Sequence, residues 1–209
     1  ARTELRGGPR AGCWAACGAR GGGKGAQART VSSGFGLTDL ATGEVGRGEG
    51  AEVGEGGRQV AALMKAGQLV PDPVMVRIVS ERLARNPDED VLLDGFPRTV
   101  EQARALDELL ASEGRRVDMV AALTAPEDAL IDRLLHRAQV ENRADDTRQA
   151  IEERMHEYHQ RTAPVLDHYR SAGVVVAEVD GVGDPGEVFG RVRVAVRPGA
   201  GPDRGPLSH

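Results

Sequence analysis

The sequence predicts an α/β fold in which helices flank a parallel β-sheet. Between Gln59 and Val182, short apolar runs alternate with amphipathic stretches, which is the pattern of strand–helix units on a parallel sheet. A second observation is the glycine-rich stretch at 18–27, GARGGGKGAQ, which has the spacing of a phosphate-cradling loop. The length of 209 residues suits one domain with a buried core. We expect this domain to span residues 1–197, followed by a disordered Pro/Gly-rich tail at 198–209.

The strands of the sheet are expected at short apolar runs. Residues 12–17, GCWAAC, stand where the first strand should lie, but small residues and the bulky Trp14 make this a poor strand. Later runs are rich in residues that favour buried strands. These stronger strands are expected at 91–93 (VLL), 117–123 (VDMVAAL) and 173–179 (GVVVAEV).

Helices are expected between the strands, because apolar residues recur there at helical spacing. The first ends before Gly114, and the second begins at Pro126, which suits the first turn of a helix. Their inward-facing positions are Ala103, Leu106 and Leu110 in the first helix, and Leu130, Leu134, Ile131 and Leu135 in the second. A longer helix is expected from about Thr147 towards Tyr169, with a kink near Pro164.

Composition and charge argue against several kinds of partner and location. A formal charge of -5 disfavours general affinity for nucleic acid or for an anionic membrane. The sequence has no run of about 18 apolar residues, and its start lacks the apolar segment of a secretory signal, so we expect a cytoplasmic protein. Cys13 and Cys17 are too few for a disulfide framework and lack a second ligand pair for zinc. We expect both to be small buried or surface thiols.

The most informative motif is LLDGFPRTVEQARAL at residues 92–106. A strand ends in the carboxylate of Asp94, Gly95 permits close backbone approach, and Phe96–Pro97 forms a rigid turn before Arg98. Open parallel sheets bind ligands outside the carboxyl ends of their strands, so Asp94 and Arg98 are expected to project into that crevice. A turn with a capping aspartate and a solvated arginine would also explain these residues.

DGFPRT, followed by Gln102 three residues after the threonine, closely resembles the signature of adenylate kinases. The resemblance extends without gaps over about Gly18 to Gly183. Its further segments are GLTDLATGEVGR, AALMKAGQLVPD, the pair RLLHR and NRADDT, and YHQRTAPVLDHY. It implies a P-loop NTPase-type parallel sheet flanked by helices, with a small helical NMP-binding subdomain at about 42–71. It also implies a short lid at about 137–143, which has no room for a zinc-binding insertion.

The glycine-rich loop keeps the family's glycine and lysine positions but departs from its pattern elsewhere. Ala19 and Arg20 replace two prolines, and Ala26 replaces the threonine that would place a hydroxyl beside the phosphates and metal. We expect this divergence to reduce affinity or rate. The residues that the resemblance assigns to ATP binding are Gly21, Gly22, Gly23, Lys24, Gly25, Ala26, Arg133, Arg137 and Gly183.

Further site residues follow from the same resemblance. Phosphoryl transfer needs positioning and neutralisation of charge, which a set of cations supplies. The implied catalytic residues are Lys24, Arg98, Arg137, Arg143 and Arg154. The implied AMP-binding residues are Thr42, Arg47, Met64, Gln68, Val70, Gly95, Arg98, Gln102, Arg143 and Arg154. Thr42 and Gln102 would recognise adenine, and Asp94 would orient Mg²⁺ through water.

We therefore expect an adenylate kinase that converts ATP and AMP into two ADP with Mg²⁺, without zinc, and as a monomer. Its expected partners are ATP, AMP and ADP. One alternative is a degenerate relative that binds AMP or ADP without turnover, which the divergent N-terminal third favours. Another alternative is a kinase for UMP or CMP. Thr42 and Gln102 argue against it, because they fit adenine.

Overall fold

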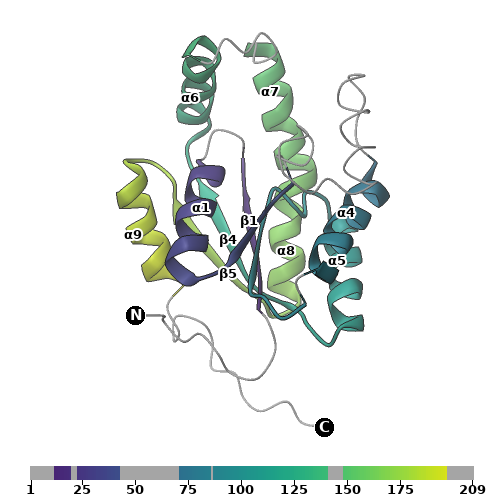
Figure 1. Cartoon of the computed structure of the whole chain (residues 1–209). Coiled ribbons are helices and arrows are strands. Elements are labelled where there is room, and N and C mark those ends of the chain that lie inside the picture. Colours follow the sequence, from purple (N-terminus) through teal and green to yellow (C-terminus); the bar gives the residue numbers. More distant parts are fainter. Residues whose placement is uncertain (1–11, 20–22, 43–70, 86, 141–147, 197–209) are drawn as a thin grey trace.

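The computed structural model describes residues 12–19, 23–42, 71–85, 87–140 and 148–196. Within these ranges, five strands form one sheet in the order β2-β3-β1-β4-β5, and all neighbouring strands are parallel (Figure 1). The strands are β1 (Cys13–Gly18), β2 (Thr38–Ala41), β3 (Val91–Asp94), β4 (Val117–Thr124) and β5 (Val175–Asp180). The predicted α/β class with a parallel sheet is confirmed.

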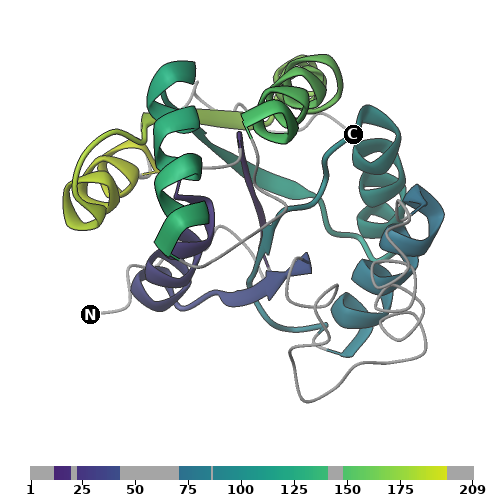
Figure 2. The same ribbon diagram turned by 90° about the horizontal axis from the view of Figure 1, so that it is seen from above.

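Helices cover both faces of the sheet. They are α1 (Lys24–Phe35), α4 (Asp72–Arg85), α5 (Val100–Ser112), α6 (Glu127–Val140), α7 (Arg148–Glu157), the π-helix η1 (Tyr158–Thr162), α8 (Ala163–Ser171) and α9 (Pro185–Ala195). α1 and α9 lie on one face, α4, α5 and α8 lie on the other, and α6 and α7 rise above the sheet (Figures 1 and 2). Among the described segments, no helix has the length and apolar character that crossing a bilayer requires.

The expectation of a poor strand at residues 12–17 is wrong, because this stretch forms β1, the central strand of the sheet. Cys13, Ala15 and Cys17 are buried on the side of α5 and α8, where small side chains let the helices pack closely. Trp14 points to the opposite face, where its ring lies 5.3 Å from that of Phe35 in α1. The large Trp14 on one face and the small side chains on the other therefore both suit a strand that is buried on its two faces.

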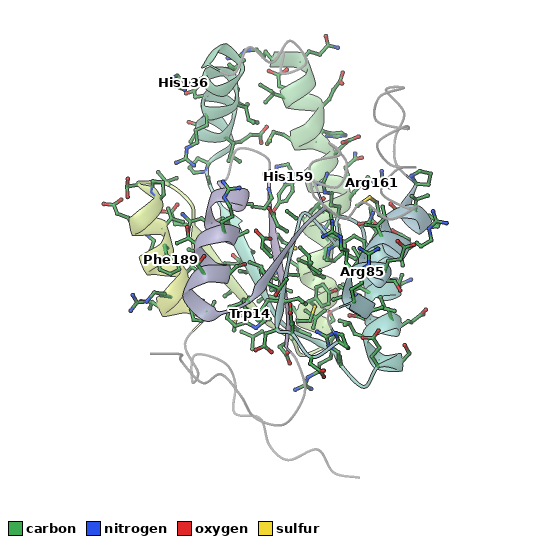
Figure 3. All side chains as sticks on the ribbon, in the orientation of Figure 1. Trp14, Arg85, His136, His159, Arg161 and Phe189 are labelled. Carbon is green, nitrogen blue, oxygen red and sulfur yellow. The ribbon has the colours of Figure 1, made fainter. Side chains whose placement is uncertain are left out.

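The other strands alternate between the same two cores, as strand geometry requires. The core beneath α4, α5 and α8 includes Val91, Leu93, Val120, Ala122, Leu106, Leu110, Val165 and Tyr169. The core beneath α1 and α9 includes Trp14, Leu92, Leu123, Val31, Val188 and Val192, with Phe189 packed against it (Figure 3). These two cores fix the strand register, and with it the points at which the strands end at the carboxyl edge of the sheet.

α6 and α7 form a separate packed pair above that edge (Figure 1). Leu130 and Leu134 of α6 are buried against Ile151 and Met155 of α7, as the helical spacing in α6 predicts. α7 continues through η1 into α8, so the predicted long helix is interrupted by a π-helical turn that ends two residues before Pro164. Pro164 lies in the first turn of α8 and has no N–H to donate, and the π-helical turn directly before it is where the continuous helix accommodates that missing donor.

Candidate active site

Two segments far apart in sequence meet where β1 and β3 end. The two strands are paired with Ala16 opposite Asp94, so their carboxyl ends lie side by side. The glycine-rich loop and α1 follow β1, and the turn from Gly95 to Arg98 follows β3. Adjacent parallel strands place their following loops at the same edge of the sheet, where ligands of such folds bind. The two motifs therefore lie at the same edge of the sheet.

The start of α1 has the properties of an anion-binding site. Its N-cap is Gly23, with a φ of 79°, no side chain caps the helix, and its first turn holds no acidic residue. The positive end of the helix dipole therefore has no carboxylate neighbour in that turn. The ammonium of Lys24 donates to the backbone carbonyl of Ala19 at 2.7 Å, which holds this cation across the loop.

Asp94 lies beside this helix start. A Cβ placed on Gly25 would be 3.6 Å from Asp94 Oδ2, so the carboxylate is close to the first turn of α1. Lys24 and Asp94 both act electrostatically on the Cys17 thiol, and Asp94 acts on Arg98. A half-buried carboxylate with cations nearby suits Mg²⁺, which is held in proteins by one or two carboxylates, water and substrate phosphates.

Gly95 occupies a position that only glycine fits. Its φ is 82°, and a Cβ there would lie 2.9 Å from Thr42 Oγ1 and 3.0 Å from a guanidinium nitrogen of Arg98. Thr42, which is buried, donates from its hydroxyl to the carbonyl of Asp94 at 3.0 Å. The end of β2 is thereby tied to the end of β3, with Gly95 at the point of closest approach.

Arg98 is an exposed cation held in a fixed position. Its Nε donates to the Gly95 carbonyl at 2.7 Å, which folds the side chain over its own turn. Surrounding protein desolvates the guanidinium and lowers its pKa, while Asp94 and Glu157 act in the opposite direction. Arginine titrates so far above neutrality that the group stays charged. A charged, restrained guanidinium at this edge is suited to binding a phosphate.

Thr162 is a site residue that the sequence does not indicate. It lies in η1, and its hydroxyl donates to the carbonyl of Arg98 at 2.9 Å. The hydrogen bond anchors the turn from a segment 64 residues away. Pro164 marks where the helix changes, but no local pattern pairs Thr162 with Arg98. π-helical insertions are frequent at functional sites, which agrees with this placement.

Gln102 is buried rather than open to the crevice. Its Oε1 accepts from the backbone N–H of Arg98 at 2.7 Å, and its Nε2 donates to Asp72 Oδ1 at 2.7 Å. A primary amide has two donors and two acceptor lone pairs, so one of each is left for a ligand. The predicted partner of adenine is therefore already engaged with the protein, and no local sequence pattern indicates Asp72 as its neighbour.

The loop after β5 is held by several other elements. Arg133 of α6 donates to the carbonyl of Gly181 at 3.0 Å, and Gln27 of α1 donates to the carbonyl of Pro185 at 2.8 Å. Gly183 has a φ of 123°, and a Cβ there would lie 2.6 Å from Glu187 Oε2. Two residues assigned to ATP binding, Arg133 and Gly183, thus belong to the same part of the structure.

The remaining predicted residues are not tested by this geometry. Gly21, Gly22, Arg47, Met64, Gln68, Val70 and Arg143 lie outside the described residues. Ala26, Arg137 and Arg154 lie in α1, α6 and α7, and their side chains are not among those described. Residues 43–70 of the predicted NMP-binding subdomain, residues 141–143 of the short lid and the tail also fall outside the described ranges.

The cysteines are free thiols, and of the buried and surface positions that the sequence leaves open, both occupy buried ones. Burial raises the pKa of Cys17 to about 12, although Lys24 acts to lower it. Cys17 therefore stays protonated near the end of β1 and offers no thiolate to chemistry at neutral pH.

This chain is similar to known proteins over most of its length. The family model described as adenylate kinase matches residues 16–174. An adenylate kinase from Leifsonia xyli subsp. xyli is 42% identical over 177 residues, which cover 84% of this chain and 88% of the relative. One from Thermus thermophilus is 39% identical over 176 residues, covering 84% and 92%. One from Clavibacter michiganensis subsp. michiganensis is 42% identical over 180 residues, covering 84% and 88%.

Proposed function

The chain belongs to the adenylate kinase family, and from this premise we propose that it catalyses reversible phosphoryl transfer, ATP + AMP ⇌ 2 ADP. The observation that carries the proposal is the grouping of Lys24, Asp94 and Arg98 at the shared edge of β1 and β3. Two cations and one carboxylate beside an uncapped helix start are suited to holding two phosphate chains end to end.

On the ATP side, Lys24 has the central role. Its ammonium exchanges the Ala19 carbonyl for oxygens of the β- and γ-phosphates when ATP binds, so the free state keeps the cation in place for the ligand. By the family's pattern, the phosphates are surrounded by the backbone N–H groups of Gly21, Gly22, Gly23, Gly25 and Ala26. Arg133 and Gly183 lie near the base, since Arg133 already holds the loop that contains Gly183.

Mg²⁺ bound with ATP would neutralise charge on the phosphate oxygens during transfer. Asp94 would hold the ion through water, because its carboxylate lies beside the first turn of α1. The chain's own cations complete the neutralisation: Arg98 binds the AMP phosphate, and Arg137, Arg143 and Arg154 close around the transferred group by the family's pattern. These arginines act by position and charge rather than by forming bonds.

On the AMP side, Thr42, Gly95 and Gln102 form the wall nearest the sheet. By the family's pattern Gly95 lets the base approach closely, and here its missing side chain lets Thr42 and Arg98 pack directly over it. The family's pattern adds Arg47 for the phosphate and Met64, Gln68 and Val70 around the base. We further propose a cytoplasmic monomer whose partners are ATP, AMP and ADP, which the charge of -5 supports by disfavouring nucleic acid and anionic membranes.

A coupled assay of ADP formation from ATP and each nucleoside monophosphate, with Mg²⁺, tests the proposal. AMP is expected to be preferred over UMP, CMP and GMP by more than about tenfold, because unmatched buried hydrogen-bonding groups weaken binding. Equal turnover of UMP would contradict the adenine assignment. Calorimetric ADP binding without any turnover would instead identify a nucleotide-binding relative that is not an enzyme.

A further inference from the structure

Asp72, at the start of α4, contacts the start of α5 through both of its carboxylate oxygens. Oδ1 accepts from Gln102 Nε2 at 2.7 Å, and Oδ2 accepts from the Thr99 hydroxyl at 3.1 Å. Thr99 is the N-cap of α5, and its hydroxyl oxygen accepts from the backbone N–H of Gln102 at 3.1 Å. Thr99 and Gln102 are each only 5% exposed, so water does not replace these partners readily.

This network gives the Gln102 amide one orientation. Its oxygen faces the backbone N–H of Arg98, which can only donate, and its nitrogen faces the carboxylate of Asp72, which accepts when ionised. A rotation of the amide by 180° would set N–H groups against the Arg98 N–H and an oxygen against the carboxylate. Both contacts would be repulsive, and the second involves a full charge.

The orientation of an amide decides which purine it can read. Adenine presents an amino donor beside a ring nitrogen that accepts, whereas a 6-oxopurine such as hypoxanthine presents a carbonyl acceptor beside an N–H donor. A base placed in the same position therefore needs the opposite amide orientation in the two cases. A glutamine that rotated freely could adapt to either base.

We propose that Asp72 is a specificity-determining positioning residue that fixes the Gln102 amide and thereby makes the site select AMP over IMP. The inference rests on the proposed function, in which Gln102 reads the base of the acceptor nucleotide. Asp72 itself acts through Gln102 and Thr99 and does not touch the nucleotide. The partner of this site is thus a 6-aminopurine nucleoside monophosphate, and its 6-oxo counterpart is rejected.

Calorimetric dissociation constants of AMP and IMP, measured on the wild type, Asp72→Ala and Asp72→Asn, test this role. The wild type is expected to bind AMP more than about tenfold more tightly than IMP. The ratio should fall at least about threefold in both variants, because the contact with Asp72 is lost while the backbone N–H of Arg98 still favours the original amide orientation. Alanine removes the acceptor, and asparagine, of nearly the same shape, offers either a donor or an acceptor and so tolerates both amide orientations.

Asp128→Ala is the matched control. Asp128 lies in the first turn of α6, which has 14 residues like α4, and its carboxylate accepts from the neighbouring backbone N–H of Ala129. The control removes the same helix-start charge but should keep the wild-type ratio. Thermal melting establishes that each variant is folded, and the near-isosteric Asp72→Asn keeps the test available if Asp72→Ala unfolds.

A wild type that binds both nucleotides equally, or Asp72 variants that lose affinity for both while keeping the ratio, would overturn the inference. Because binding is measured without turnover, the result is separate from the enzymatic proposal. A wild type that selects AMP but forms no ADP would contradict the proposed function, while the ratios in the Asp72 variants would still decide the role of Asp72.

Discussion

Arg98 shows how single residues at this site are held before any ligand binds. Its side chain donates to Gly95, its backbone N–H donates to Gln102, and its carbonyl accepts from Thr162. Two of these hydrogen bonds fix the backbone of Arg98 and one restrains its guanidinium, which stays exposed. A cation that is already positioned loses little freedom when a phosphate binds, which favours affinity and rate.

Replacing Arg98 by alanine should therefore impair AMP use without unfolding the protein. We expect kcat/KM for AMP to fall about 100-fold or more, equivalent to about 3 kcal/mol, because a charged phosphate contact is lost. Steady-state kinetics with varied AMP measure this effect. Arg104→Ala on the exposed side of α5 serves as the control and should leave the kinetics unchanged. A lower melting temperature with unaltered AMP kinetics would show that Arg98 is structural instead.

At the scale of elements, the turn after β3 depends on η1. Because Thr162 donates to the Arg98 carbonyl, Thr162→Val should loosen that turn while keeping the side-chain shape. We expect KM for AMP to rise about fivefold with KM for ATP unchanged, since one hydrogen bond contributes about 1 kcal/mol. Thr38→Val removes a hydroxyl that donates to Glu89 at the other end of the sheet, and it should alter neither constant. Equal increases in both constants would argue against a local role.

β1 provides a second prediction at this scale, through its cysteines. Burial raises the pKa of both Cys13 and Cys17 from 9.0 to about 12. Below pH 9 both thiols are protonated in the folded and unfolded states, so they contribute no pH dependence there. Between about pH 9 and 12 the unfolded thiols ionise and the folded ones do not, so stability should fall by up to about 1.4 kcal/mol per pH unit for each cysteine.

Urea unfolding at pH 8 to 10.5 measures this slope, and Cys17→Ala should reduce it. At pH 8, alkylation of the native thiols should be no faster than unfolding, because both side chains are at most 3% exposed. Rapid labelling of folded protein would contradict the placement of β1 at the centre of the sheet.

Sequence patterns predict elements whose signal is local. β3, β4 and β5 follow from apolar runs, and α6 from the spacing of Leu130 and Leu134, which are buried as expected. Strand propensity underrates β1 because it describes a single strand, whereas Cys13 and Ala15 owe their burial to helices on that face. The contacts of Thr162 and Asp72 with the site join segments distant in sequence, so no local pattern contains them.

At the scale of the whole molecule, the parallel sheet brings the glycine-rich loop and the DGFPR turn together. Lys24 and Asp94 are about 70 residues apart in the sequence. The pairing of β1 with β3 brings the two motifs together in space. The motif and the family membership identify the kind of reaction, and the sheet provides the shared edge where it is proposed to take place. The divergence at Ala19, Arg20 and Ala26 leaves the lysine and its backbone partner in place.

The most direct test of the account is ADP formation from ATP and AMP by the wild type and by Lys24→Met, with calorimetric ADP binding on both proteins. We expect measurable turnover by the wild type and a loss of about 100- to 1000-fold in Lys24→Met, because a charge contact at the transferred phosphoryl group is worth about 3 to 4 kcal/mol. If both proteins are equally inactive while ADP still binds, the chain binds nucleotides without catalysis and the central claim is contradicted.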